Sequence, residues 1–181
     1  MRRRLALCLV AVMLTTACAR QAPRPVPAES TADIYVAVLR KYLSTPSDNS
    51  FAAGTFRLAF VFDRANAAAA DPSGSHIDDG TPIPLSDQQK LTSALADLLP
   101  VTFVATHDEV LIPAQESPSC KVVRDNGILV TLAPPKDEGT RVTVGISGYV
   151  ACLGATWLTY VVVRDVAGWK VTGTTGSRAI A

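Results

Sequence analysis

The chain has 181 residues, of which 48% are hydrophobic, 6% aromatic and 18% charged. This length suits a single domain, and the composition is that of a globular protein rather than a disordered one. Without the three arginines at the N-terminus, 14 basic side chains stand against 16 acidic ones, a net charge of −2. No block of like charge occurs in this remainder, so we expect no nucleic-acid partner.

Residues 1–17 are typical of a signal peptide. Arg2, Arg3 and Arg4 precede an uncharged run from Leu5 to Thr16. A helix of 12 residues is about 18 Å long, too short for the roughly 30 Å hydrocarbon core of a membrane. We therefore expect this segment to direct export and to be removed, and not to span the membrane.

Leu14-Thr15-Thr16-Ala17-Cys18 resembles a lipobox, the motif at which bacterial lipoproteins are cut and lipidated, although Thr15 stands where leucine is commonest. The resemblance implies cleavage before Cys18, a diacylglyceryl anchor on that cysteine, and residence on the extracytoplasmic face of the membrane. An alternative stays open. Ala17-Cys18-Ala19 is also an A-x-A site, at which ordinary signal peptidase would cut after Ala19 and release a soluble secreted protein.

Cysteine usage favours the lipidated form. Cys8 leaves with the leader and Cys18 is consumed by lipid, so Cys120 and Cys152 remain as an even pair in an oxidising compartment. We expect a disulfide between them, worth roughly 3–4 kcal/mol in the chain-entropy model. The alternative is two small buried thiols that do not meet.

The mature chain is expected to begin with a tether and one helix. Residues 18–31 are rich in proline and read as a semi-rigid spacer, and residues 32–181 as a single domain. A helix is predicted from about Ala32 to Leu43, with Ser30 and Asp33 as a capping pair and Pro46 beyond its end. Its apolar stripe consists of Ile34, Tyr35, Val38, Leu39 and Tyr42.

A strand, a long loop and a second helix follow. Phe56 to Asp63 alternates with a period of two, which predicts a strand with one aromatic face near the centre of the core. Ala65 to Pro84 has no apolar periodicity, and a loop of about 20 residues is either functional or mobile. A helix from Leu85, with Ser86 and Gln89 as a capping box, ends before Pro100. Short strands are expected at Val101–Ala105 and Val110–Ile112.

The last third of the chain predicts a β-meander. Asn126-Gly127 is typical of a tight turn joining strands Lys121–Arg124 and Ile128–Leu132. Three further β-rich runs, at 141–152, 155–164 and 168–173, are separated by links too short for anything but antiparallel neighbours. The predicted class is α+β, with two helices packed on an antiparallel sheet and a C-terminal β-meander of about four strands.

This order of elements, with the closing strand Trp169-Lys170-Val171, resembles that of cystatin-like and NTF2-like folds. A lipobox ahead of a small domain rich in Ala, Thr and Val is also similar to lipoproteins of actinobacteria, which implies a location and no particular activity.

The sequence contains two clusters of potential metal ligands. His76 lies near Asp71, Asp78 and Asp79, but this loop lacks the central glycine and terminal glutamate of a calcium loop, so a solvated surface loop is favoured. His107-Asp108-Glu109 are consecutive, so we expect a polar turn there. The sequence therefore predicts no metal or other cofactor.

Three other patterns are candidates for a catalytic or ligand-binding site. Gly145-Ile146-Ser147-Gly148 lacks the G-x-S-x-G spacing of a nucleophile elbow, so its glycines are expected to mark a bulge or a close backbone approach. The segment 173–178 lacks the lysine and the following helix of a phosphate loop, and we expect a strand end fraying into the terminus. Trp157, Tyr160 and Trp169 are expected to pack rather than to line a ligand pocket.

No catalytic residues are predicted. The favoured function is that of a non-enzymatic binding or accessory module, anchored through Cys18, whose partner is an envelope protein or a small apolar ligand. The alternative is a small hydrolase or isomerase with an NTF2-like pocket. That alternative requires a titratable side chain inside an apolar cone, whereas a filled core argues against it.

Overall fold

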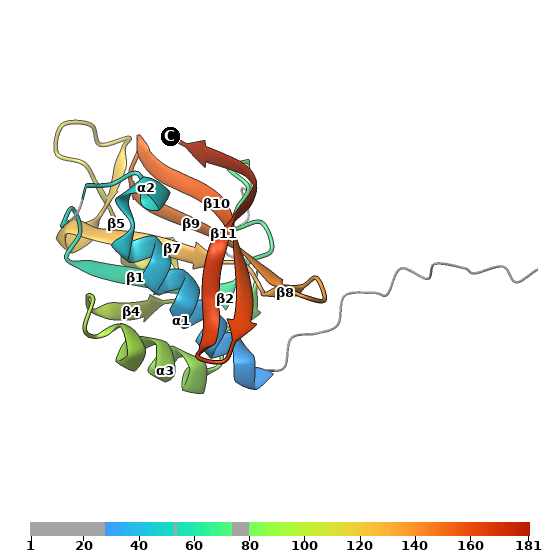
Figure 1. The fold of residues 1–181 in the computed structure, drawn as a ribbon. Helices are drawn as coiled ribbons and strands as arrows, with labels where there is room; N and C mark the ends of the chain where they lie inside the picture. Colours follow the sequence, from blue (N-terminus) through green and yellow to red (C-terminus); the bar gives the residue numbers. More distant parts are fainter. Residues whose placement is uncertain (1–27, 53, 74–79) are drawn as a thin grey trace, which may run out of the picture.

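The computed structural model describes residues 28–52, 54–73 and 80–181 (Figure 1). Cys18 with the expected tether up to residue 27, and the candidate metal ligands His76, Asp78 and Asp79, lie outside the described residues. The helices are α1 (Ala28–Ser44), α2 (Pro46–Asn49) and α3 (Leu85–Leu95), with short 3₁₀ turns at His107–Glu109 (η1) and Arg124–Asn126 (η2). No helix in the described ranges is long and apolar enough to cross a membrane.

The strands form one large curled sheet and a small separate pair. Strand bounds are β1 Leu58–Phe62, β2 Arg64–Ala65, β3 Thr81–Pro82, β4 Val101–Val104, β5 Leu111–Pro113, β6 Lys121–Val123, β7 Gly127–Leu132, β8 Lys136–Asp137, β9 Val142–Ala151, β10 Gly154–Asp165 and β11 Gly168–Ile180. The nine-stranded sheet follows the order β11-β10-β9-β7-β1-β4, with β5, β6 and β8 attached beside it.

The large sheet is mixed, which corrects the predicted antiparallel sheet. β1 pairs in parallel with β4 (Ala59 opposite Val101) and also with β7 (Ala59 opposite Ile128). The reason lies in the connection: α3 carries the chain from β1 back to the same end of the sheet, and such a crossover makes the two strands parallel. The mixture of helices and strands was predicted correctly. The antiparallel pairing was predicted correctly for β9, β10 and β11 and wrongly for β1.

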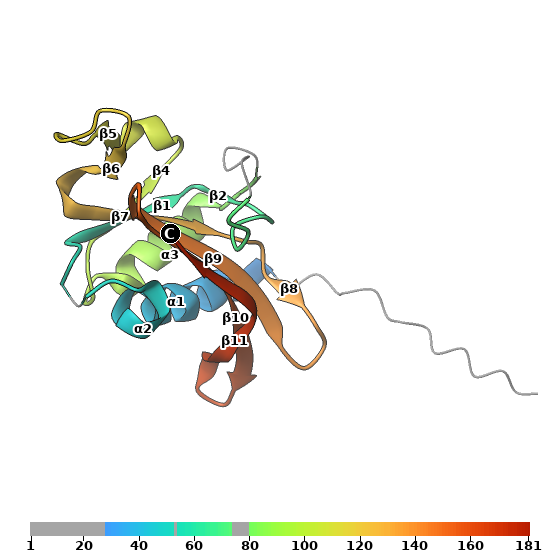
Figure 2. The ribbon, with the colours of Figure 1, turned by 90° about the horizontal axis from the view of Figure 1, so that it is seen from above.

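The helices α1 and α3 cover one face of the sheet (Figures 1 and 2). The predicted stripe of α1 is buried in full, as are Leu91 and Leu95 of α3. An exposed ion pair, Lys90 to Asp33 at 2.7 Å, links the two helices. α1 begins at Ala28, four residues before the predicted start. α3 has Pro84 at its N-cap without a side-chain hydrogen bond, so the predicted Ser86/Gln89 capping box does not form.

Strand β1 lies at the centre of the core, as predicted. Its two sets of alternate residues enter different cores. Ala59 and Val61 face the helices, whereas Phe60 and Phe62 lie in a second cluster on the opposite face. The other buried members of this cluster are Val104, Val110, Val123 and Leu129. The aromatic face therefore packs beneath β5, β6 and η1, and not beneath the helices.

The predicted hairpin at Asn126-Gly127 is wrong. Asp125 and Asn126 both adopt positive φ, +58° and +52°, within the turn η2. This turn redirects the chain, so that β6 pairs with β5 and β9, and β7 pairs with β1 and β9. Burial explains the choice: all six residues of β7 are buried, and a place between β1 and β9 keeps both edges of the strand hydrogen-bonded.

The C-terminal meander is present in the order β7-β9-β10-β11. The last strand is longer than predicted. After an irregularity near Gly176, β11 resumes its pairing with β10 at Ala179 and Ile180, and Ala155 and Ala181 exchange two backbone hydrogen bonds. The segment 173–178 is thus part of a paired strand and not a frayed end, because pairing satisfies its backbone groups.

Candidate binding site

The helix-covered side of the sheet is filled by tyrosines. Tyr35, Tyr42 and Tyr160 are among the largest fully buried or nearly buried side chains of the core. The Tyr35 hydroxyl donates to the carbonyl of Ala133 at 3.2 Å, and the hydroxyls of Tyr42 and Thr156 share a short hydrogen bond. In the described part of the chain, the space that an NTF2-like pocket would need between α1 and the sheet is therefore occupied.

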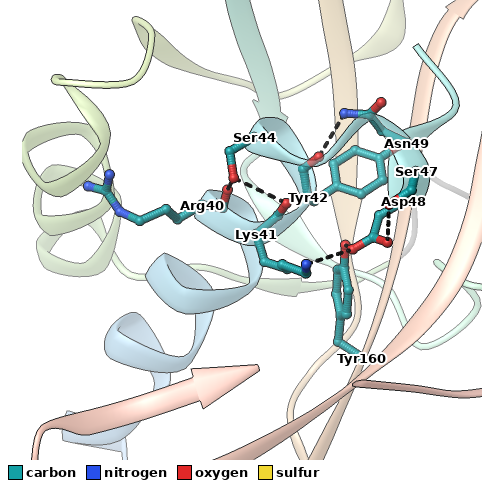
Figure 3. Close-up of polar contacts among 8 residues, drawn as sticks. All are labelled: Arg40, Lys41, Tyr42, Ser44, Ser47, Asp48, Asn49 and Tyr160. Carbon is teal, nitrogen blue, oxygen red and sulfur yellow. Dashed lines mark hydrogen bonds and ion pairs between the residues drawn. The ribbon is translucent and has the colours of Figure 1, made fainter. Parts of the chain in front are cut away.

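A polar cluster closes the end of α1 onto β10 (Figure 3). The Tyr160 hydroxyl donates to Asp48 Oδ2 at 2.8 Å, and Lys41 Nζ lies 3.7 Å from the same oxygen. Asn49 Nδ2 donates to the Tyr42 carbonyl at 2.7 Å. The Asp48 side chain is only 18% exposed, and its charge is balanced by Lys41. This cluster joins the helix terminus to the strand, and its groups bind one another rather than facing a cavity.

Burial raises the pKa of the Tyr35, Tyr42 and Tyr160 hydroxyls well above the ordinary tyrosine value. For Tyr160, the hydrogen bond to Asp48 raises the pKa further, because only the neutral phenol can donate that bond. Folding therefore favours the neutral hydroxyl at all three positions. Because the unfolded chain ionises near pH 10, the stabilisation is complete below about pH 10 and is lost as the pH rises above it.

We expect base to unfold the domain cooperatively. Three such tyrosines lower the free energy of unfolding by about 4 kcal/mol per pH unit above pH 10. Near-ultraviolet tyrosinate absorbance and circular dichroism, followed together against pH, should change in one transition. Gradual ionisation of all the tyrosines near pH 10 in a protein that keeps its circular dichroism would contradict this account.

The opposite face of the meander is open and carries a groove of about 550 Å³. Its floor is a row of small residues that pair across three strands: Gly145 on β9 lies opposite Thr159 on β10, which lies opposite Thr175 on β11. With strands about 4.8 Å apart, this row extends roughly 10 Å. The remaining lining residues are Ala67, Ala70, Ala133, Pro134, Pro135, Lys136, Asp137, Glu138 and Thr143.

One wall of the groove comes from the first part of the segment predicted as a structureless loop. The backbone N–H of Asn66 donates to the carbonyl of Leu132 at 2.8 Å, and the Asn66 side chain accepts from the N–H of Ala68 at 2.7 Å. These bonds hold the alanine-rich turn on the sheet. A Cβ atom at Gly145 would lie 3.0 Å from that of Ala70, so glycine allows the close approach of this wall.

The other wall carries charges of both signs. Glu138 accepts from Arg141 at 2.9 Å and lies 3.7 Å from Lys136 Nζ. The hydrogen bond from Arg141 lowers the pKa of Glu138, with smaller contributions from the charges of Arg141 and Lys136. On the floor, the Thr159 and Thr175 hydroxyls have no hydrogen-bond partner among the described residues. The groove therefore offers two hydroxyls between an aliphatic wall and a wall that carries charges of both signs.

The other residues that the sequence offered as metal-binding or aromatic sites have structural roles. His107, Asp108 and Glu109 form the turn η1, in which Glu109 caps the N–H of Thr106 at 2.8 Å and the His107 ring lies 4.7 Å from that of Phe62. No group of three or more His, Cys, Asp or Glu side chains in the described ranges is placed to hold a metal ion. Trp157 and Tyr160 face opposite sides of β10 and do not stack on each other.

The cysteine pair is placed as predicted. The sulfurs of Cys120 and Cys152 lie 2.21 Å apart, at disulfide distance. Cys120 precedes β6 and Cys152 lies in the turn between β9 and β10, so the pair holds the β5–β6 hairpin against the end of the meander. Gly148, part of the rejected nucleophile pattern, lies against Tyr42, which agrees with the expected close backbone approach.

Sequence reasoning missed the groove. The available signals were the run Ala67–Ala70 and the recurrence of Gly and Thr at alternate positions of the meander. Neither predicts a groove until strand register brings the small residues into one row.

Comparisons with protein-family models, with curated proteins and with solved structures find no match for this chain.

Proposed function

We propose that this protein is an envelope lipoprotein, held on the extracytoplasmic face of a bacterial membrane by lipid on Cys18, whose domain binds an extended segment of another envelope protein in the open-face groove. The leader and the lipobox resemblance support the anchor. The observation that carries the binding role is the contrast between the two sides of one sheet: the helix side is filled, and the other side has an open groove.

The groove suits an extended polypeptide. It ends at Thr175 on β11, and β11 is the last strand on its side of the sheet, with β10 as its one strand neighbour. A partner strand added at that edge would place one side chain beside Thr175, in line with Thr159 and Gly145, and would turn every second side chain to the groove side of the sheet. The unpartnered hydroxyls can bind backbone groups, and the Ala and Pro walls can bury aliphatic side chains.

The alternative, a hydrolase or isomerase with an interior pocket, finds less support. It needs an apolar cone with an inward titratable group, whereas three tyrosines occupy that space in the described residues. Asp48, whose carboxylate accepts from Tyr160, is also paired with Lys41.

A photo-reactive amino acid at Thr175, in cells that express the full chain, should cross-link to one envelope protein. The same group at Thr92 is the matched control, because Thr92 is an exposed residue of α3, on the helix-covered side of the sheet. Thr159→Trp fills the groove and should lower the adduct yield about tenfold, as for the loss of about 1.4 kcal/mol of binding. Equal yields at positions 92 and 175, or an adduct that survives Thr159→Trp, would refute the groove as a binding site.

A further inference from the structure

Both hairpin turns at the ends of β10 expose an aliphatic side chain. Leu153, in the β9–β10 turn, is 89% exposed, and Val166, in the β10–β11 turn, is fully exposed. Tight turns favour Asn, Asp and Gly, so an aliphatic residue at such a tip is unusual. β10 has 12 residues, which places the two tips about 40 Å apart at opposite ends of the domain.

The Val166 tip lies at the end where the expected tether joins the domain. Tyr42, near the C-terminus of α1, binds Thr156 at the start of β10, so α1 runs back from the Leu153 end toward the other end. Figure 1 shows the start of α1, the β10–β11 turn and α3 at the lower end of the molecule, and Figure 2 shows that the turn projects away from the two helices across this end. Nine residues lie between Cys18 and Ala28, and a chain of that length spans at most about 35 Å.

A second exposed aliphatic side chain lies at this same end. Leu85, the first residue of α3, is 74% exposed. Its neighbours Pro84 and Asp87 share a pocket with Thr31 of the first turns of α1, which places the start of α3 beside the start of α1. The tethered end thus presents two aliphatic side chains to its surroundings.

Two basic side chains and one tryptophan also lie at the tethered end of the domain. Arg164 and Lys170 flank the β10–β11 turn and are exposed, and Trp169 is half-buried behind it. Of the acids nearby, Asp165 accepts the N–H of Ala167 at 2.8 Å within the turn, Asp33 is paired with Lys90, and Asp87 lies in the first turn of α3. Aliphatic tips with flanking cations and a tryptophan behind them suit the headgroup region of a bilayer.

We propose that the tethered end of the domain rests on the bilayer, with Val166 and Leu85 among the lipid headgroups and Arg164 and Lys170 near the phosphates. This orientation turns the Leu153 end away from the membrane. The inference depends on the proposed lipid anchor, which delivers this end to the surface. Two aliphatic side chains are too few to hold the free domain, but they suffice to orient one that is already concentrated there.

The test uses the lipidated full-length protein in vesicles of phosphatidylethanolamine and phosphatidylglycerol. Spin labels are placed through Val166→Cys, Leu85→Cys and, as the distal control, Ile112→Cys on β5, since Cys18 is acylated and Cys120 and Cys152 are paired. Labels at 166 and 85 should collide more with lipid-soluble oxygen than with a water-soluble nickel complex, and the label at 112 should show the reverse. Adding Val166→Asp to the Leu85→Cys protein should lower the oxygen preference of its label about tenfold.

The outcomes distinguish a failure of the lipid anchor from a failure of the proposed orientation. A protein that does not float with the vesicles refutes the anchor. A protein that floats, yet carries labels at 166 and 85 as water-exposed as the one at 112, refutes the orientation and leaves the anchor standing. The labelled side chains are exposed, so an unchanged melting temperature shows that the variants are folded.

Discussion

Replacing Cys18 with alanine should remove the protein from the membrane. Two acyl chains contribute about 0.8 kcal/mol for each buried methylene, enough for a stable anchor where a single chain would be marginal. Among the described residues, no helix is long and apolar enough to cross a membrane. We expect wild type in the membrane fraction with the mass of the acylated chain, and Cys18→Ala in the soluble fraction without it.

Cys8→Ala is the matched control for this experiment. It also removes a thiol from the leader, yet the proposed cleavage discards position 8, so acylation and localisation should be unchanged. Intact-mass measurement also separates the two cleavage sites. A wild-type chain that begins at Arg20 and carries no lipid would show cleavage after Ala19 and would overturn the lipoprotein proposal.

Gly148→Ala should be the most damaging single methyl group that can be added to the described fold. A Cβ atom there would lie 2.1 Å from Tyr42 Oη and 2.8 Å from Tyr42 Cζ. Tyr42 is fully buried and binds Thr156, which is also buried. Displacing the ring combines overpacking with a lost hydrogen bond, so we expect the free energy of unfolding to fall by about 3–5 kcal/mol.

Urea denaturation measures this loss, and the chain offers two controls. A Cβ atom at Gly173 would meet no atom within 4 Å, so Gly173→Ala should change stability by less than about 0.5 kcal/mol. Tyr42→Phe removes the atom closest to the new methyl group, so the double variant should regain part of the loss. If Gly148→Ala is as stable as Gly173→Ala, then Tyr42 does not pack on β9 as described.

Local patterns predicted the elements with regular periodicity. The predicted stripe of α1 repeats every three to four residues, and all of its side chains are buried in the structure. The short links between β9, β10 and β11 allow only antiparallel neighbours, and these pairs form. In both cases the deciding information lies within about 20 consecutive residues.

Pairings between distant segments were not predictable in this way. Asn126-Gly127 has the composition of a hairpin turn, yet β7 leaves it to lie between β1 and β9, where all six residues of β7 are buried. The choice depends on the free energy of burying Phe56–Asp63 beside Gly127–Leu132, some 70 residues away, and no local signal carries that comparison.

The export signal and the lipid anchor that we propose for residues 1–18 rest on the sequence alone. Local sequence patterns predicted the helix faces and the strands of the meander. The number of cysteines predicted the pairing of Cys120 with Cys152. Only tertiary structure decided that the sheet is mixed, that Tyr42 lies on Gly148, and that Gly145, Thr159 and Thr175 form the floor of a groove. Each of these features is a contact between residues far apart in the chain, and such contacts are selected by the packing of the whole domain.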